Sequence, residues 1–178
     1  MQYGFKLDPG EIITRVVHRH VLDVLPTLLL ALLLALGSAV LAYIMGRSPE
    51  SAPFPPILMA ALISIMFVIS LIIFIVSIYV YSRNVLIFTN IHLIQVEQLA
   101  LFQRRVSQLS FKRVEDVTGR KQGILQTIFN YGEFQVQSAG EQEKFIFRNA
   151  PDPEALADDA LQIHEACLRD AGETEPRF

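Results

Sequence analysis

Two long uncharged apolar runs dominate the first half of the chain, and shorter alternating runs fill the second half. The long runs cover residues 24–45 and 56–81, and neither contains an ionisable Asp, Glu, Lys, Arg or His. As α-helices they would extend about 33 Å and about 39 Å, enough to cross a bilayer core of about 30 Å. The pattern therefore predicts two transmembrane helices within residues 23–82.

The connection between the two runs, residues 46–55, is short and rich in proline. It starts at Gly46 and contains Pro49, Pro53 and Pro55, residues that end one helix and begin the next. A loop of this length makes the two spans antiparallel neighbours with a short external loop. A cleavable signal peptide is the alternative for the first run, but the run is longer than the usual apolar region of such a peptide and about 20 residues precede it.

The lysine and arginine residues near the spans predict their orientation. Lys6, Arg15 and Arg19 come before the first run and Arg83 follows the second, whereas the loop carries Arg47 with Glu50. Because cytoplasmic flanks carry the excess of Lys and Arg, both termini are expected in the cytoplasm, with the two spans in the inner (cytoplasmic) membrane.

Small residues recur at four-residue spacing in both runs, as at Ala31, Ala35 and Ala39 and at Ala60 and Ser64. Such spacing lets helix backbones approach closely, which favours packing within the hairpin over a contact between copies; the oligomeric state stays open. Since ion-coupled carriers place ionisable groups at membrane depth, the hairpin is expected to be an anchor rather than a conduit.

Residues 1–22 are expected to form a cytoplasmic segment with a helix along the membrane surface. Pro9 suits a helix start, and Ile12, Ile13, Val16 and Val17 follow at positions compatible with one helical face.

From residue 83 onward the pattern changes to short runs rich in β-forming residues. The predicted strands are residues 85–89, 91–96, 99–106, 113–118, 134–138 and 144–148, and spacing suggests about seven in all. Between them, the apolar segment 123–132 is expected to tuck a short helix or turn into the core. Asp152 and Pro153 then begin a helix that runs to about Asp170 with one apolar face. Residues 171–178 are expected to be disordered.

Several short motifs follow one another in this second half. They are Arg104-Arg105-Val106-Ser107-Gln108-Leu109-Ser110-Phe111, Arg113-Val114-Glu115-Asp116-Val117, Gly123-Ile124-Leu125, Phe129-Asn130-Tyr131-Gly132, Ser138-Ala139-Gly140, Phe145, Phe147 and Asn149-Ala150-Pro151. Together they resemble the bacterial pleckstrin-homology-like (PH-like) membrane proteins of the YdbS type. The resemblance covers about residues 83–164. It implies an α+β fold in which a transmembrane hairpin precedes a PH-like β-barrel or sandwich, residues 83–170, capped by the C-terminal helix.

Charge is informative only locally, because the formal net charge of the 178 residues is −3 and gives no reason to expect a nucleic-acid partner. Residues 104–121 hold six basic side chains against Glu115 and Asp116: Arg104, Arg105, Lys112, Arg113, Arg120 and Lys121. They are candidates for contact with anionic lipid headgroups or a partner. The competing interpretation is a solvated strand face.

No motif for phosphate binding, a serine nucleophile, a zinc protease or a Cys-x-x-Cys site is present, so the sequence favours a protein that is not an enzyme and has no cofactor or metal. The single Cys167 excludes an intrachain disulfide. Two functions remain. The first is a non-catalytic scaffold that binds another protein through an exposed strand edge or the groove beside the C-terminal helix. The alternative is an anionic-lipid-binding module in envelope homeostasis.

Overall fold

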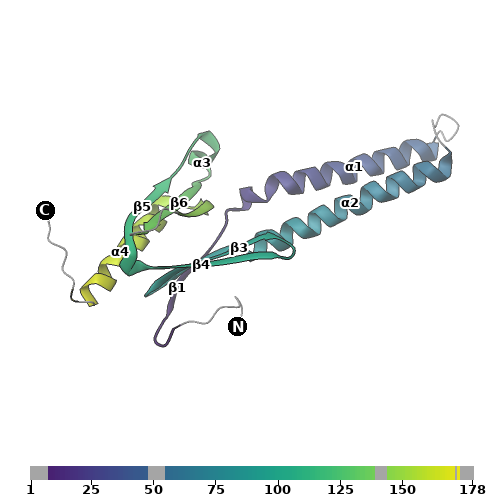
Figure 1. The fold of residues 1–178 in the computed structure, drawn as a ribbon. Coiled ribbons are helices and arrows are strands. Elements are labelled where there is room, and N and C mark those ends of the chain that lie inside the picture. Colours follow the sequence, from purple (N-terminus) through teal and green to yellow (C-terminus); the bar gives the residue numbers. More distant parts are fainter. Residues whose placement is uncertain (1–7, 48–54, 139–143, 171, 173–178) are drawn as a thin grey trace. The chain divides into compact units, whose positions relative to one another are not determined.

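The computed structural model describes residues 8–47, 55–138, 144–170 and 172, which form two compact units (Figure 1). One unit, residues 21–81, contains the two apolar runs. The other joins the chain up to His20 with the chain from Ser82 onward. The predicted external loop and the predicted disordered tail fall almost wholly outside the described residues.

The first unit is a pair of long helices, α1 (Leu25–Arg47) and α2 (Pro56–Arg83), preceded by a short 3-10 turn, η1 (Val21–Asp23). By length and composition both helices could cross a membrane. The Ser70 hydroxyl of α2 donates a hydrogen bond of 2.7 Å to the Ala31 carbonyl of α1, and both residues are buried. Close approach at Ala31 thus confirms packing within the hairpin at one of the predicted small residues.

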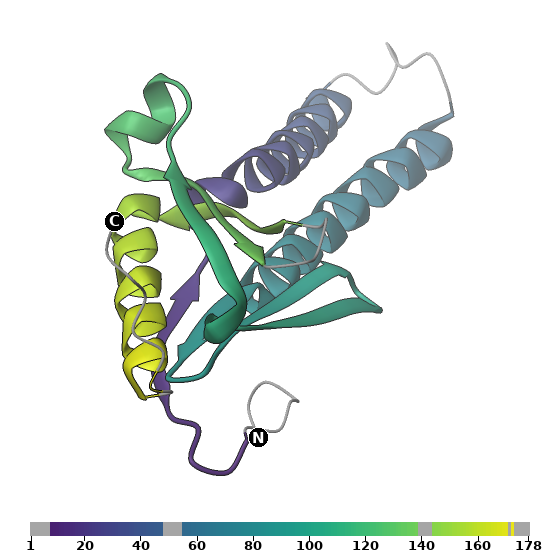
Figure 2. The same cartoon turned by 60° about the vertical axis from the view of Figure 1, so that its left-hand side comes forward.

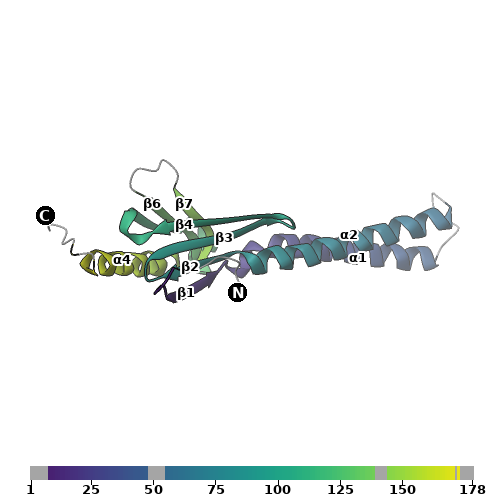
Figure 3. The ribbon, with the colours of Figure 1, turned by 60° about the horizontal axis from the view of Figure 1, so that its bottom comes forward.

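The second unit consists of two antiparallel sheets and two helices. Sheet A has the order β1 (Ile13–His18), β2 (Val85–Thr89), β3 (His92–Ala100) and β4 (Gln103–Ser110) (Figure 3). Sheet B has the order β5 (Val114–Arg120), β6 (Tyr131–Ser138) and β7 (Phe145–Pro151). A 3-10 turn, η3 (Phe111–Arg113), joins the sheets, α3 (Ile124–Ile128) lies between β5 and β6, and α4 (Pro153–Asp170) follows β7.

The first strand comes from the segment for which a membrane-surface helix was predicted, and that prediction is wrong. β1 pairs with β2 along its length, from Ile13 opposite Thr89 to His18 opposite Val85. Isoleucine, threonine and valine fill most of β1, and β-branched side chains favour a strand once a partner strand is available. The domain is therefore discontinuous in sequence, because both apolar helices are inserted between its first two strands.

The core lies between the sheets and α4. Four phenylalanines, Phe88, Phe111, Phe134 and Phe147, are fully buried there. The predicted apolar face of α4 joins them through Leu156, Ala160 and Cys167, and the Asp152 carboxylate approaches the Ala155 amide at 3.5 Å as a weak N-terminal cap. β2 is buried on both faces because Val85 and Ile87 belong to a second apolar cluster with Ile94 and Val96. These features confirm the predicted sandwich with its C-terminal helix (Figure 1).

Two further predictions need correction. Residues 99–106 are not one strand, because Leu101 and Phe102 form the turn between β3 and β4. The segment 123–132 does contain a short helix, but α3 does not enter the core, and its apolar side chains are exposed. In both places apolar residues that a soluble domain would bury are exposed to solvent.

Candidate functional site

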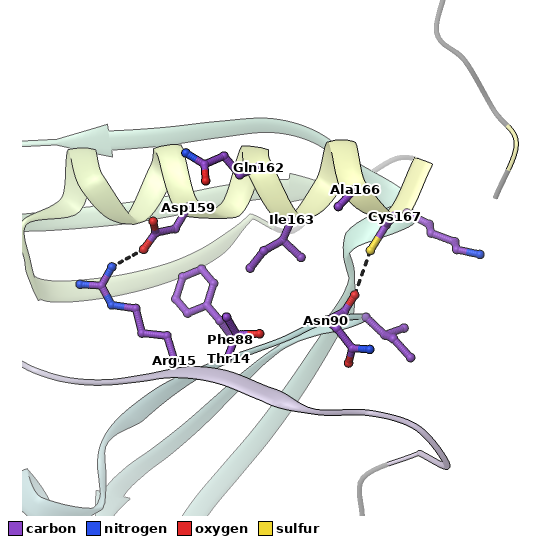
Figure 4. A pocket seen from close by; sticks show the side chains of 11 residues that line it. Thr14, Arg15, Phe88, Asn90, Asp159, Gln162, Ile163, Ala166 and Cys167 are labelled. Carbon is purple, nitrogen blue, oxygen red and sulfur yellow. Dashed lines mark hydrogen bonds and ion pairs between the residues drawn. The ribbon is translucent and has the colours of Figure 1, made fainter. Parts of the chain in front are cut away.

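A groove of about 640 Å³ lies between the edge of sheet A and α4. Its apolar floor consists of Phe88 from β2 with Ile163 and Cys167 from α4. Its rim is polar and charged: Thr14, Arg15, Asn90, Lys112, Asp159 and Gln162. Figure 4 shows Phe88 and Ile163 pointing toward each other in the middle of this groove. We call it the β1–α4 groove.

The groove lies beside β1, an edge strand of sheet A whose end is close to sheet B and whose start lines the groove. Beyond the last residue of β1, the His20 amide donates a hydrogen bond of 2.6 Å to the Asn149 carbonyl of β7, which ties the two sheets together there. Toward its start, β1 has a bulge between Ile13 and Arg15. On this half α4, rather than a strand, faces the edge of β1.

Two contacts cross the groove at its opposite ends (Figure 4). The Arg15 guanidinium forms an ion pair with Asp159, and the Cys167 thiol donates to the Asn90 carbonyl at 3.0 Å. On the same helix His164 Nδ1 contacts the Phe111 carbonyl at 2.6 Å. The thiol and the imidazole thus hold α4 against the sheets, and the groove offers a shaped apolar floor with charged sides, which is suited to binding.

A buried carboxylate lies next to the groove, beside the turn between β2 and β3. The Glu11 side chain is only 2% exposed. One of its oxygens contacts the Thr89 hydroxyl at 2.6 Å and His92 Nδ1 at 3.0 Å, and the other accepts the Asp8 amide at 2.8 Å. Burial alone would raise the pKa of Glu11, but these hydrogen bonds and the nearby imidazole outweigh it and lower that pKa below its usual value of 4.5.

Asp8, Glu11 and His92 bring potential metal-ligand atoms within 4.8 Å of one another. Both Glu11 oxygens are already hydrogen-bonded, and one of their partners is the His92 ring itself. The cluster therefore ties the segment before β1 to the β2–β3 turn and so fixes one side of the groove.

The six basic residues proposed from sequence do not form one patch. Arg104 and Arg105 begin β4, and Lys112 and Arg113 lie in η3 at its far end, roughly 25 Å away for an extended strand of this length. Arg120 is the last residue of β5 and Lys121 follows it, and Lys121 forms an ion pair of 2.9 Å with Glu154 of α4. Of the six, Lys112 alone lines the β1–α4 groove.

Sequence reasoning missed most of the groove because it assigned β1 to a helix. It did name an exposed strand edge or the groove beside the C-terminal helix as candidate binding surfaces, and in this fold the groove lies at the strand edge. The signal that could have placed β1 was its content of β-branched residues, Ile13, Thr14, Val16 and Val17.

Two antiparallel sheets closed by a C-terminal helix, with a groove at the strand edge, define a PH-like interaction domain. A family model described as "Bacterial PH domain" matches residues 20–162, so the chain belongs to the bacterial PH domain family. The match begins after β1 and includes both apolar helices.

A solved structure similar to this chain is that of a DUF1696 family protein with a pleckstrin-homology domain from Shewanella loihica PV-4. Its identity is 12% and the TM-score is 0.39, over 47% of this chain and 73% of that one. No curated protein matches the chain. PH domains bind proteins or lipids, and membership of the family supports an interaction module of that general kind.

Proposed function

We propose that the protein is a membrane-anchored, non-catalytic scaffold. The helices α1 and α2 cross the cytoplasmic membrane as a hairpin with both termini inside, and they hold the PH-like domain at its inner face. There the β1–α4 groove binds an extended segment of a partner protein.

The coincidence of an edge strand with a groove is the observation that carries this proposal. Sheet A ends at β1, and within the part of the chain that the structure describes no strand forms a hydrogen-bonded ladder with the outer edge of β1. An extended peptide can add to such an edge through its backbone, while pockets for alternate side chains give specificity. Ile91, Ile163 and Ala166 line the groove and are accessible to an apolar side chain, and Lys112 at the rim suits a carboxylate.

Binding of anionic lipid headgroups by the basic stretch is the alternative, and it has less support. A headgroup site needs several cations converging on one place. The six candidates lie at three separate places, and Lys121 is already ion-paired with Glu154.

Photocrosslinking in native membranes tests the scaffold. We would place p-benzoylphenylalanine at Gln162, which is exposed and lines the groove, and at Leu161, an exposed residue on the opposite face of the same helix. We expect a protein adduct at Gln162 that survives high salt, and mass spectrometry should map the crosslink to one extended segment of one partner. Position 161 should give no such adduct.

A second variant makes the test specific for the groove. Ala166 is exposed and lines the groove, so Ala166→Arg fills it without entering the core. The adduct at Gln162 should be lost in Ala166→Arg and kept in Leu161→Arg. Equal adducts at positions 161 and 162, or an adduct that Ala166→Arg leaves unchanged, would contradict the scaffold.

A further inference from the structure

The turn between β3 and β4 presents apolar side chains to solvent on a projecting hairpin. Val96 of β3 lies opposite Val85, the first residue of β2, and β3 and β4 then continue together as far as Ala100 opposite Gln103. At the turn Phe102 is 99% exposed, and Leu99 and Leu101 are also exposed. Figure 2 shows the hairpin projecting from the rest of sheet A.

This turn has a fixed shape. The buried Gln98 side chain donates hydrogen bonds to the carbonyls of Ala100 at 2.6 Å and Leu101 at 3.2 Å. The Asn84 side chain in turn bonds both the amide and the carbonyl of Gln98, at 3.0 and 3.2 Å. The hydrogen bonds hold the backbone in place and leave Leu101 and Phe102 pointing away from the domain.

α3 makes a second apolar projection, from sheet B (Figure 2). Ile124 is 79% exposed, and Leu125, Ile128 and Phe129 are exposed with it. The Thr127 hydroxyl donates a hydrogen bond of 3.0 Å to the Gly123 carbonyl and closes this turn of helix. A soluble domain rarely exposes several large apolar side chains together unless they meet a partner or a membrane.

Both projections adjoin the places where the domain connects to the apolar helices. Asn84, which holds the β3–β4 turn through Gln98, directly follows Arg83, the last residue of α2. The His20 ring, directly before η1, stacks at 5.0 Å on Tyr131, which lies three residues after the end of α3. The Cα atoms of consecutive residues are about 3.8 Å apart. If α1 and α2 cross the bilayer, His20 and Asn84 must therefore lie near the bilayer surface.

Basic residues accompany the apolar ones. Arg104 and Arg105 follow the β3–β4 turn, and Arg120 ends β5 shortly before α3. Glu97 lies opposite Arg105 in the sheet, and its carboxylate pairs with Arg19 at 3.1 Å. Apolar side chains with arginines just behind them fit an anionic bilayer surface, where the former enter the acyl boundary and the latter meet headgroups.

We infer that the β3–β4 turn and α3 are two points at which the domain docks on the lipid bilayer. Leu101 and Phe102 enter the interface at one point, and Ile124, Leu125 and Ile128 enter at the other. This inference rests on the proposed membrane anchor, but it assigns a different surface from the β1–α4 groove. Docking at two points would restrict the rotation of the domain on the bilayer.

Tryptophan fluorescence in proteoliposomes tests the inference, because the chain contains no tryptophan. Full-length single-tryptophan variants Phe102→Trp and Ile124→Trp report the two docking points. Ile12→Trp is a matched control. Ile12 is apolar and exposed, but its backbone amide donates a hydrogen bond to the Asn90 side chain, which follows the end of β2 farthest from the β3–β4 turn. Phe67→Trp in α2 reports the anchor itself. Vesicles contain phosphatidylethanolamine and phosphatidylglycerol, with or without brominated acyl chains. The bromine lies near the headgroup end for the two docking positions and Ile12→Trp, and near the methyl end for Phe67→Trp, whose tryptophan is expected near the bilayer centre.

We expect the emission of Phe102→Trp and Ile124→Trp to shift to the blue and to lose intensity in brominated vesicles, as that of Phe67→Trp does, while Ile12→Trp is unaffected. Quenching of Phe67→Trp without quenching at both docking positions would overturn the inference and leave the anchor standing. That result is expected if the two projections bind a partner protein instead of lipid. Equal quenching of Ile12→Trp would also overturn it. Without quenching of Phe67→Trp, the anchor fails and the inference fails with it.

Discussion

The two ends of sheet A differ in which side chains they bury and which they expose. At the β2–β3 turn a carboxylate, Glu11, is buried and hydrogen-bonded by Thr89 and His92. At the β3–β4 turn Phe102 is almost completely exposed. Burying a carboxylate without partners is unfavourable, and so is exposing a cluster of large apolar side chains to water. Each arrangement therefore implies a neighbour that compensates for the cost. For Glu11 that neighbour is within the chain, and for Phe102 we propose the bilayer.

The comparison also separates two surfaces. Asn90, at the polar end of sheet A, lines the β1–α4 groove, whereas the two apolar projections adjoin the chain connections to α1 and α2. A domain that docks on lipid by one end can keep the other for a partner. The predictions below test whether the ends have these separate roles.

The largest effect is expected from loss of β1, which supplies the strand edge of the groove and the buried Val17. Residues 82–178 alone should not fold cooperatively. Joining His20 to Ser82 through a linker of about six residues should give a folded domain without the helices, because His18 and Val85 are paired neighbours that a hairpin-length loop can connect. Thermal unfolding followed by circular dichroism distinguishes the two proteins.

The linked domain also serves as the control, since it differs from the fragment by the segment that contains β1. Equal unfolding transitions for the two would mean that β1 is dispensable. The discontinuous domain would then be wrong, and the groove would lose one of its sides.

The next largest effect contrasts two phenylalanines. Phe134→Ala removes a fully buried ring and should cost about 3–5 kcal/mol of the free energy of unfolding, as large-to-small core changes do. Phe102→Ala should change that free energy by less than about 0.5 kcal/mol, because exposed sites away from packing are nearly neutral. Denaturant titration of the linked domain gives both values. A large loss from Phe102→Ala would show that this ring packs on the domain and is not available to lipid.

Much of the fold was predictable because its periodicity was local. The two helices, the strands after residue 83 and the α4 helix from Pro153 to Asp170 follow from runs of one residue type and from Asp152 and Pro153 at a helix start. The PH-like sandwich followed from the motifs between residues 104 and 151 and is confirmed by the family match.

The failures occur where a distant partner decides the structure. β1 is a strand because β2 pairs with it from the other side of both helices, and spacing within residues 12–17 also allowed a helix. The turn at Leu101 and Phe102 and the exposed α3 break the rule that apolar residues are inside. Because the chain beyond residue 83 was expected to be a soluble domain, the turn was predicted as part of a strand and α3 as part of the core.

An intermediate effect is expected at Glu11. Glu11→Gln replaces one accepting oxygen with a donor and should cost about 1–3 kcal/mol of local stability. Because the pKa of Glu11 is lowered on folding, its stabilisation is fully present above pH 4.5 and is lost as the pH falls through the lowered value. The variant should lack this pH dependence.

Hydrogen–deuterium exchange of the β1 amides, measured on the full-length chain in detergent, detects the loss directly. The matched control is Glu165→Gln, since Glu165 is exposed and pairs with Arg169 on the outside of α4. The proposed role of Glu11 is wrong if the two variants exchange alike at neutral pH, or if wild type and Glu11→Gln respond equally to acid.

The smallest effect on stability concerns the Arg15–Asp159 ion pair across the groove. Its two side chains are partly exposed, so a double-mutant cycle should assign it about 0.2–1 kcal/mol.

Asp159→Asn leaves Arg15 and Lys112 facing the groove without that carboxylate, and the yield of the Gln162 adduct should rise at low salt if the partner segment is acidic. Glu154→Gln is the control, because it breaks the Lys121 pair on the same helix outside the groove. Similar adduct yields from the two variants would remove the acidic partner segment from the proposal, since only one of them changes the charge that such a segment would meet.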